Sequence, residues 1–89
     1  MHNRKKMALI SGVTSGVGEE LTKAFISRGW GVVGIARNKE KLAMMRETLG
    51  VSFTGYSVDL KNKHEIEDCF KEIKLNVKSI DLLINNAAL

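Results

Sequence analysis

The chain has 89 residues, no proline, a single cysteine and a formal net charge of +4. This length allows one small domain, and the charges are mixed in sign without a basic stripe, which argues against nucleic-acid binding. No apolar run approaches the ~20 residues that span a bilayer, and one cysteine excludes an internal disulfide, so we expect a cytoplasmic protein that spans no membrane.

The first predicted elements flank a glycine-rich loop. A strand is expected over about Lys6–Ser11, and a helix that Gly29 ends is expected after the loop Gly12–Gly18. One face of this helix is apolar, with Val17, Leu21, Ala24 and Phe25. Strand, glycine loop and helix start together are typical of pyrophosphate binding, because the backbone can approach the anion and the helix N-terminus attracts it. We expect Gly16 and Gly18 to allow this approach and to let the helix lie close to the strand.

Two further strand and helix pairs and a last strand follow. The expected elements are a strand over Gly31–Ala36, a helix from Asn38 to Gly50, a strand over about Val51–Val58, a helix from Asn62, and a strand over Asp81–Asn85. Asn62 and Glu65 have the spacing of a capping box. The expected buried side chains are Leu42, Met45 and Leu49 in the second helix, and Ile66, Phe70, Ile73 and Val77 in the third. Cys69 follows Ile66 by three residues, so we expect a buried, unreactive thiol.

The alternation of strands and helices predicts an α/β fold, a doubly wound parallel sheet of Rossmann type with strand order 3-2-1-4. Residues 1–89 would then form a partial NAD(P)-binding Rossmann domain that stops after its fourth strand. The first two helices should lie on one face and the third on the other. Ligands of such folds bind between the first and fourth strands, where Gly12–Gly18 and Asn85–Ala88 both fall.

Polar residues stand at the predicted strand ends. Arg37 follows the second strand, where an NAD-binding fold commonly has an acid, and a guanidinium suits a 2′-phosphate instead. The alternative is an ordinary exposed arginine. Asp59 follows the third strand and could be a simple turn residue. Asn85 and Asn86 end the fourth strand, where their amides need hydrogen-bond partners that could tie the strands together.

These motifs resemble those of the short-chain dehydrogenase/reductase family. Ser11–Gly18 resembles its Thr-Gly-x-x-x-Gly-x-Gly loop, and Asn85–Ala88 resembles its Asn-Asn-Ala-Gly motif with alanine in the glycine position. The resemblance implies NADP rather than NAD as cofactor, because Arg37 occupies the position that marks NADP preference. Ser15 stands where some members carry a second basic residue. The cofactor-binding residues that the resemblance implies are Gly12, Thr14, Ser15, Gly16, Val17, Gly18, Arg37, Asp59, Leu60, Asn86, Ala87 and Ala88, with Asp59 accepting a hydrogen bond from the adenine amino group.

The residues of the family's chemistry are not found in the chain. Family members transfer hydride between the nicotinamide and a carbonyl or alcohol with a Tyr-x-x-x-Lys pair and a serine. The only tyrosine, Tyr56, has Leu60 four residues later and is expected in the core, and His64 is expected on the surface. We therefore assign no catalytic residue and no metal ligand. We expect the cofactor-binding half of an NADP-preferring enzyme, as a fragment or truncated product, which would be inactive alone and whose intact parent takes a small carbonyl or alcohol substrate.

Two alternatives stay open at this point. One is a non-catalytic nucleotide-sensing or regulatory Rossmann protein, and the other is an α/β enzyme that binds S-adenosylmethionine or a sugar nucleotide. A chain that stops after the fourth strand would also leave Leu82-Leu83-Ile84 as an apolar edge. Unpaired edges of this kind pair with other chains, so we expect self-association through this strand, most simply a symmetric homo-oligomer of two chains.

Overall fold

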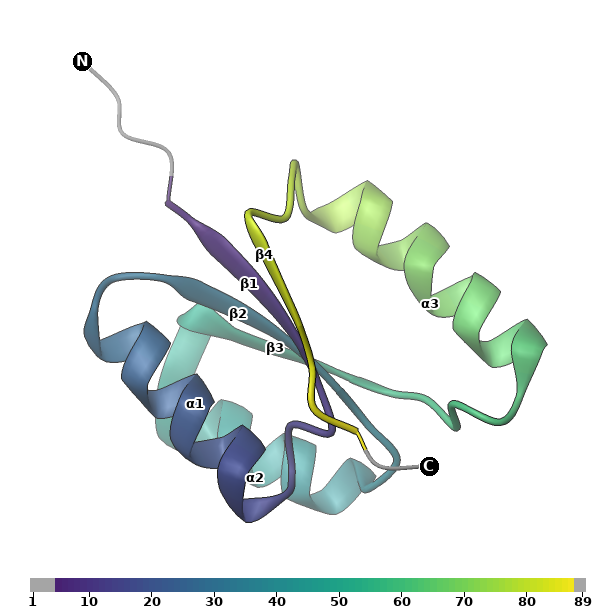
Figure 1. Ribbon diagram of the computed structural model, residues 1–89, viewed down its shortest axis with the longest axis horizontal. Coiled ribbons are helices and arrows are strands. Elements are labelled where there is room, and N and C mark those ends of the chain that lie inside the picture. The colour runs from purple at the N-terminus through teal and green to yellow at the C-terminus, as the bar shows by residue number, and fades with distance from the viewer. Residues whose placement is uncertain (1–4, 88–89) are drawn as a thin grey trace.

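The computed structural model describes residues 5–87. Within that range its elements are β1 (Met7–Ser11), α1 (Gly16–Ser27), β2 (Gly31–Ala36), α2 (Lys39–Leu49), the 3₁₀ turn η1 (Gly50–Ser52), β3 (Phe53–Ser57), α3 (Lys63–Asn76) and β4 (Leu82–Asn85). The strands are parallel and lie in the order β3-β2-β1-β4, which confirms the predicted doubly wound sheet. In Figure 1, α1 and α2 lie on one side of this sheet and α3 lies on the other.

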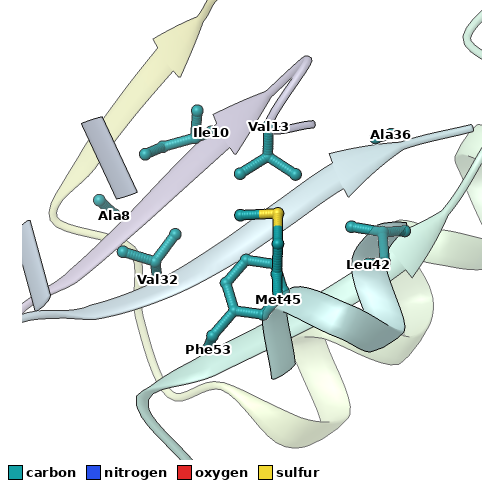
Figure 2. Packing of buried hydrophobic residues seen from close by; sticks show 8 residues of the cluster. All are labelled: Ala8, Ile10, Val13, Val32, Ala36, Leu42, Met45 and Phe53. Carbon is teal, nitrogen blue, oxygen red and sulfur yellow. The ribbon is translucent and has the colours of Figure 1, made fainter. Parts of the chain in front are cut away.

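Side chains of the central strands alternate between the two faces of the sheet, as extended backbone requires. The cluster buried beneath α1 and α2, drawn in Figure 2, consists of Ala8, Ile10, Val13, Val32, Ala36, Leu42, Met45 and Phe53. The cluster on the α3 face consists of Leu9, Val33, Ile35, Val58, Cys69 and Ile73. Because β1 and β2 contribute to both clusters, they are continuous apolar runs in the sequence.

Each helix begins at a side-chain cap, which typically contributes about 1 kcal/mol to stability. The capping oxygens belong to Ser15 for α1, Asn38 for α2 and Asn62 for α3. The predicted Asn38 and Asn62 caps are therefore confirmed. The reciprocal half of the predicted capping box is wrong, because the Asn62 amide already donates to the Asp59 carbonyl at 2.9 Å. The Glu65 carboxylate accepts instead from the Asp59 amide at 3.1 Å.

The third strand starts later than predicted. Val51, expected in the strand, lies in η1 and its side chain is 85% exposed. The chain leaves α2 at Gly50 with a φ of 78°, a left-handed conformation that favours glycine, and the 3₁₀ turn follows before Phe53 becomes extended. The positive φ of Gly29, 89°, likewise marks the predicted end of α1.

The buried faces of α1 and α3 match the predicted ones in part, since Leu21 and Phe25 of α1 and Ile66, Ile73 and Val77 of α3 lie in or pack against the two clusters. Val17 and Ala24 are exposed, and α1 buries Gly18 and Thr22 instead. Gly18 allows the close contact, and the Thr22 hydroxyl is satisfied because it donates to the Gly18 carbonyl at 2.8 Å. In α3, Phe70 is 42% exposed, whereas the smaller Cys69 is buried as expected.

No helix among residues 5–87 combines the length and the apolar character that crossing a membrane requires.

Candidate functional site

A cavity of about 510 Å³ lies at the carboxyl ends of the strands. It is lined by Gly12, Thr14, Ser15, Ile35, Ala36, Arg37, Asn38, Val58, Asp59, Leu60, Lys61, Asn86 and Ala87. These residues follow or end all four strands of the described sheet, so the doubly wound topology brings them together. The volume and the mixture of apolar walls with a few polar groups are typical of small-molecule sites.

The glycine loop is held against two strands. The Gly12 amide donates to the Ile35 carbonyl of β2 at 2.8 Å, and Gly12 has a φ of 65°. A Cβ at Gly12 would lie 2.8 Å from the Ala87 Cα atom. A Cβ at Gly18 would collide with the Gly12 carbonyl oxygen and lie 2.8 Å from the Val13 Cα atom. The protein's own packing therefore explains why both positions are glycine.

Gly16 differs from the other two loop glycines. A Cβ built there meets no atom within 4 Å, and its φ is not in the left-handed region. The expectation that Gly16 lets the helix approach the strand is therefore wrong, and Gly18 alone has that role. Nothing within the described chain requires glycine at position 16, which stands at the N-terminus of α1. Open space beside a helix N-terminus suits the close approach of an anionic ligand.

The two asparagines connect β4 to β1 and to the loop. The Ser11 hydroxyl donates to Asn85 Oδ1 at 2.9 Å, and the Asn86 amide donates to Ser11 Oγ at 3.0 Å. The Asn86 side chain donates from Nδ2 to the Gly12 carbonyl and to Ser15 Oγ, each at 3.0 Å. These contacts confirm the predicted role of the asparagines in tying strands together.

The hydroxyl of Ser15 has no capacity left for a further ligand. It donates to the Gly12 carbonyl at 2.9 Å, and it accepts from the Gly18 amide and from Asn86 Nδ2, each at 3.0 Å. A serine hydroxyl has one donor hydrogen and two acceptor lone pairs, so this set uses all three. Ser15 lines the cavity, but its side chain is committed to holding the loop in shape.

The loops after β2 and β3 form the opposite wall of the cavity. The Val58 amide donates to the Ala36 carbonyl at 2.8 Å, and the Ser57 hydroxyl donates to the Arg37 carbonyl at 3.0 Å. The Lys61 amide donates to Asp59 Oδ1 at 2.9 Å, which bends the chain into a turn over residues 59–61. The alternative role of Asp59 as a turn residue is therefore confirmed, and both Asp59 and Arg37 line the cavity.

Most of the residues predicted to bind a cofactor converge on this cavity, namely Gly12, Thr14, Ser15, Arg37, Asp59, Leu60, Asn86 and Ala87. Gly16, Val17 and Gly18 do not line it, and the Val17 side chain is 64% exposed. Ala88 lies outside the described residues. Sequence reasoning missed the lining residues Ile35, Ala36, Asn38, Val58 and Lys61 as site residues. Their positions could have identified them, because each lies within two residues of a predicted strand end or of the motif that follows it.

Other titratable side chains lie away from the cavity. Tyr56 packs against the α3-side cluster, as predicted for a core residue, and His64 is exposed beside Glu67. Burial raises the pKa of the Cys69 thiol, and the carboxylate of Glu72 raises it further. No group of three or more His, Cys, Asp and Glu side chains within residues 5–87 is arranged to hold a metal ion.

Comparison with known proteins points to one family. Residues 6–89 match the family model described as short chain dehydrogenase. Serine 3-dehydrogenase of Agrobacterium fabrum is 35% identical over 81 residues, which cover 91% of this chain and 32% of that protein. An NADP-dependent 3-hydroxy acid dehydrogenase of Escherichia coli K12 is 32% identical over 83 residues, covering 93% and 34%. The closed form of a serine dehydrogenase complexed with NADP⁺ has a TM-score of 0.86 at 32% identity, covering 93% and 34%.

The match extends over nearly all of this chain but over only part of its relatives. The chain spans about a third of the length of the curated proteins it matches.

Proposed function

Because this chain belongs to the short chain dehydrogenase family, we propose that it is the NADP-binding portion of an oxidoreductase that transfers hydride between NADP(H) and a carbonyl or alcohol substrate. The observation that carries the proposal is the shared cavity at the strand ends, which brings the glycine loop, Arg37, Asp59 and Asn86 together. The names of the relatives support the cofactor, since one is an NADP-dependent enzyme and a similar structure is an NADP⁺ complex.

The proposed roles follow from the charges and donors at each position. The guanidinium of Arg37 binds the 2′-phosphate through charge-assisted hydrogen bonds. The N-terminus of α1, with the open space beside Gly16, receives the pyrophosphate. Asp59 Oδ1 is occupied by the Lys61 amide, so its other carboxylate oxygen accepts from the adenine amino group. The bound cofactor would supply the nicotinamide that accepts or donates the hydride.

Ligand titration tests this proposal directly. We expect the 89-residue chain to bind NADP⁺ more tightly than NAD⁺ in calorimetric titrations. Equal affinities would remove the assigned 2′-phosphate site, and failure to bind either dinucleotide would remove the proposed function as a whole.

The catalytic step belongs to residues that these 89 positions do not contain. No Tyr-x-x-x-Lys pair occurs in the sequence, since the only tyrosine, Tyr56, has Leu60 rather than lysine four residues later. We therefore expect the chain alone to show no turnover. Serine and 3-hydroxy acids, named for its relatives, are the first substrates to assay with NADP⁺, and aldehydes and ketones with NADPH. A change in NADPH absorbance that scales with the amount of pure chain would contradict this expectation.

The same sequence observation keeps a non-catalytic nucleotide-sensing protein as the second candidate. Both candidates share the cavity and its cofactor. They differ in whether a Tyr-x-x-x-Lys pair is encoded elsewhere in the same gene, which sequencing of the gene on both sides of this segment would decide.

A further inference from the structure

The cavity has a cation that the proposed binding roles leave unused. The charged residues among those that line it are Arg37, Asp59 and Lys61. Lys61 is exposed, and its backbone amide donates to Asp59 Oδ1 at 2.9 Å. Within residues 5–87, the structure gives neither Arg37 nor Lys61 an ion pair with a carboxylate. Both cations are therefore available to an anionic ligand.

The fold brings these two cations to one wall. β2 and β3 pair in parallel, with Ala36 opposite Ser57, so the loops that follow them leave the sheet side by side. The hydrogen bond from the Ser57 hydroxyl to the Arg37 carbonyl at 3.0 Å fastens one loop to the other. The turn at Asp59, closed by the Lys61 and Asn62 amides, then returns the chain to the rim of the cavity.

A single arginine leaves part of the charge of a 2′-phosphate uncompensated. A phosphate monoester carries about −1.5 to −2 charges near pH 7. The glycine loop supplies no cation, since it reads Ser-Gly-Val-Thr-Ser-Gly-Val-Gly. The Ser15 hydroxyl is also fully engaged within the loop. Any second positive group for this phosphate must come from elsewhere on the cavity wall.

We propose that Lys61 is this second cation, so that it shares the 2′-phosphate with Arg37 and sets part of the preference for NADP over NAD. The inference rests on the proposed function, because it assumes that the cavity holds the adenosine 2′-phosphate end of the cofactor. Lysine suits the role as a mobile point charge, whereas the planar arginine fork provides the directed hydrogen bonds.

The test compares two lysines that lie two positions apart. Lys61→Ala and Lys63→Ala each remove one positive charge from the exposed surface, but Lys63 does not line the cavity. Each variant is titrated calorimetrically with NADP⁺ and with NAD⁺ at low salt. We expect Lys61→Ala to weaken NADP⁺ binding by about tenfold, the effect of one charge-assisted contact, and NAD⁺ binding by less than about twofold. Lys63→Ala should change both affinities by less than about twofold, and Lys61→Arg should keep most of the preference.

The possible outcomes distinguish a failure of the Lys61 role from a failure of the proposed NADP-binding function. Equal NADP⁺ affinities of Lys61→Ala and Lys63→Ala would overturn the role of Lys61. If Arg37→Ala still abolished the preference in that case, the NADP-binding function would stand without Lys61. If the unaltered chain bound both dinucleotides equally, the 2′-phosphate site and the role of Lys61 would both fall, and if it bound neither, the proposed function would fall as well. Raising the salt concentration should shrink the difference between the two lysine variants, because exposed charge pairs are screened.

Discussion

Arg37 is the residue on which the proposed cofactor preference chiefly depends. It is exposed at the end of β2, and its own backbone carbonyl is anchored by the Ser57 hydroxyl. We expect Arg37→Asp to weaken NADP⁺ binding by about 1.5–3 kcal/mol, because a charge-assisted contact is lost and a like charge then faces the phosphate. Calorimetric titration measures the change. Arg28→Asp is the matched control, since Arg28 is exposed at the end of α1 and does not line the cavity. An equal loss in both variants would assign the effect to overall charge.

Replacing each of the two glycines of α1 by valine should have different effects on stability. At Gly18 a side chain would collide with the Gly12 carbonyl, so we expect a loss of about 1–3 kcal/mol in the free energy of unfolding. At Gly16 a Cβ would meet no atom within 4 Å, so the free energy of unfolding should change by about 0.5 kcal/mol or less.

At Gly16 we expect valine to abolish cofactor binding although it leaves stability nearly unchanged. The valine side chain would occupy the space that we assign to the pyrophosphate, so Gly16→Val should fold normally and lose NADP⁺ binding. Urea denaturation and calorimetry together measure both quantities. Normal binding by a folded Gly16→Val variant would show that the phosphate lies elsewhere.

At the scale of elements, the start of α3 depends on one side chain. Asn62 Oδ1 accepts from the amides of His64 and Glu65, at 3.1 and 3.2 Å. We expect Asn62→Ala to lower the free energy of unfolding by about 1 kcal/mol, and Asn62→Asp to retain most of it, because both native and aspartate caps offer an acceptor. Denaturant titration distinguishes the two variants. Similar stabilities for alanine and aspartate would mean that this cap contributes nothing measurable.

Local patterns in the sequence predict these elements well because strand burial and helix capping depend on residues close together in the chain. The apolar runs at Met7–Ser11 and Gly31–Ala36 mark strands that are covered on both faces, and Asn38 and Asn62 mark helix starts. The strand order followed from topology rules for alternating strands and helices. The late start of β3 followed from the local turn at Gly50, whereas the errors on the helix faces involved packing between elements. The exposure of Val17 depends on how closely Gly18 seats α1 on the loop, which periodicity does not record.

Site residues that belong to a sequence motif could be predicted, whereas residues that reach the cavity only through the fold could not. Arg37, Asp59 and Asn86 end strands within recognisable patterns, and the structure brings them to one cavity. Lys61 carries no pattern, since a lysine before a helix is common on any surface. Its place on the cavity wall depends on the local turn at Asp59 and on the hydrogen bond from the Ser57 hydroxyl to the Arg37 carbonyl, which joins positions 20 residues apart.

At the scale of the whole molecule, helices cover both faces of the sheet, but within residues 5–87 its β4 edge is left open. α1 and α2 cover one face and α3 covers the other, as Figure 1 shows. At the β3 edge, the Arg46 guanidinium donates to the Phe53 carbonyl at 3.0 Å and so occupies one of the edge acceptors. At the opposite edge, β4 pairs with β1 and, among the described residues, with no further strand. Leu82 is 40% exposed and Leu83 is 63% exposed there.

We therefore expect the 89-residue chain to self-associate through β4. Leu83 lies opposite Leu9 of the α3-side cluster, whereas Leu82 lies opposite Ala8 of the other cluster, so apolar side chains flank the open edge on both faces. An edge with unpaired amides and carbonyls between apolar side chains is a template for a second strand. Antiparallel pairing of two β4 strands about a twofold axis closes the assembly, because each chain offers the same edge to the other.

A charge placed on the edge should prevent this pairing without disturbing the fold. Leu83→Lys would desolvate an ammonium group in the paired state, whereas in the single chain it stays in water, since the side chain is already largely exposed. Leu75→Lys is the matched control, because Leu75 is 84% exposed on α3 and lies outside the strand edge. Light scattering across a dilution series should show a dimer that dissociates on dilution for the unaltered chain and for Leu75→Lys, and a monomer throughout for Leu83→Lys. A monomeric unaltered chain at high concentration, or a dimer that survives Leu83→Lys, would show that the β4 edge does not mediate association.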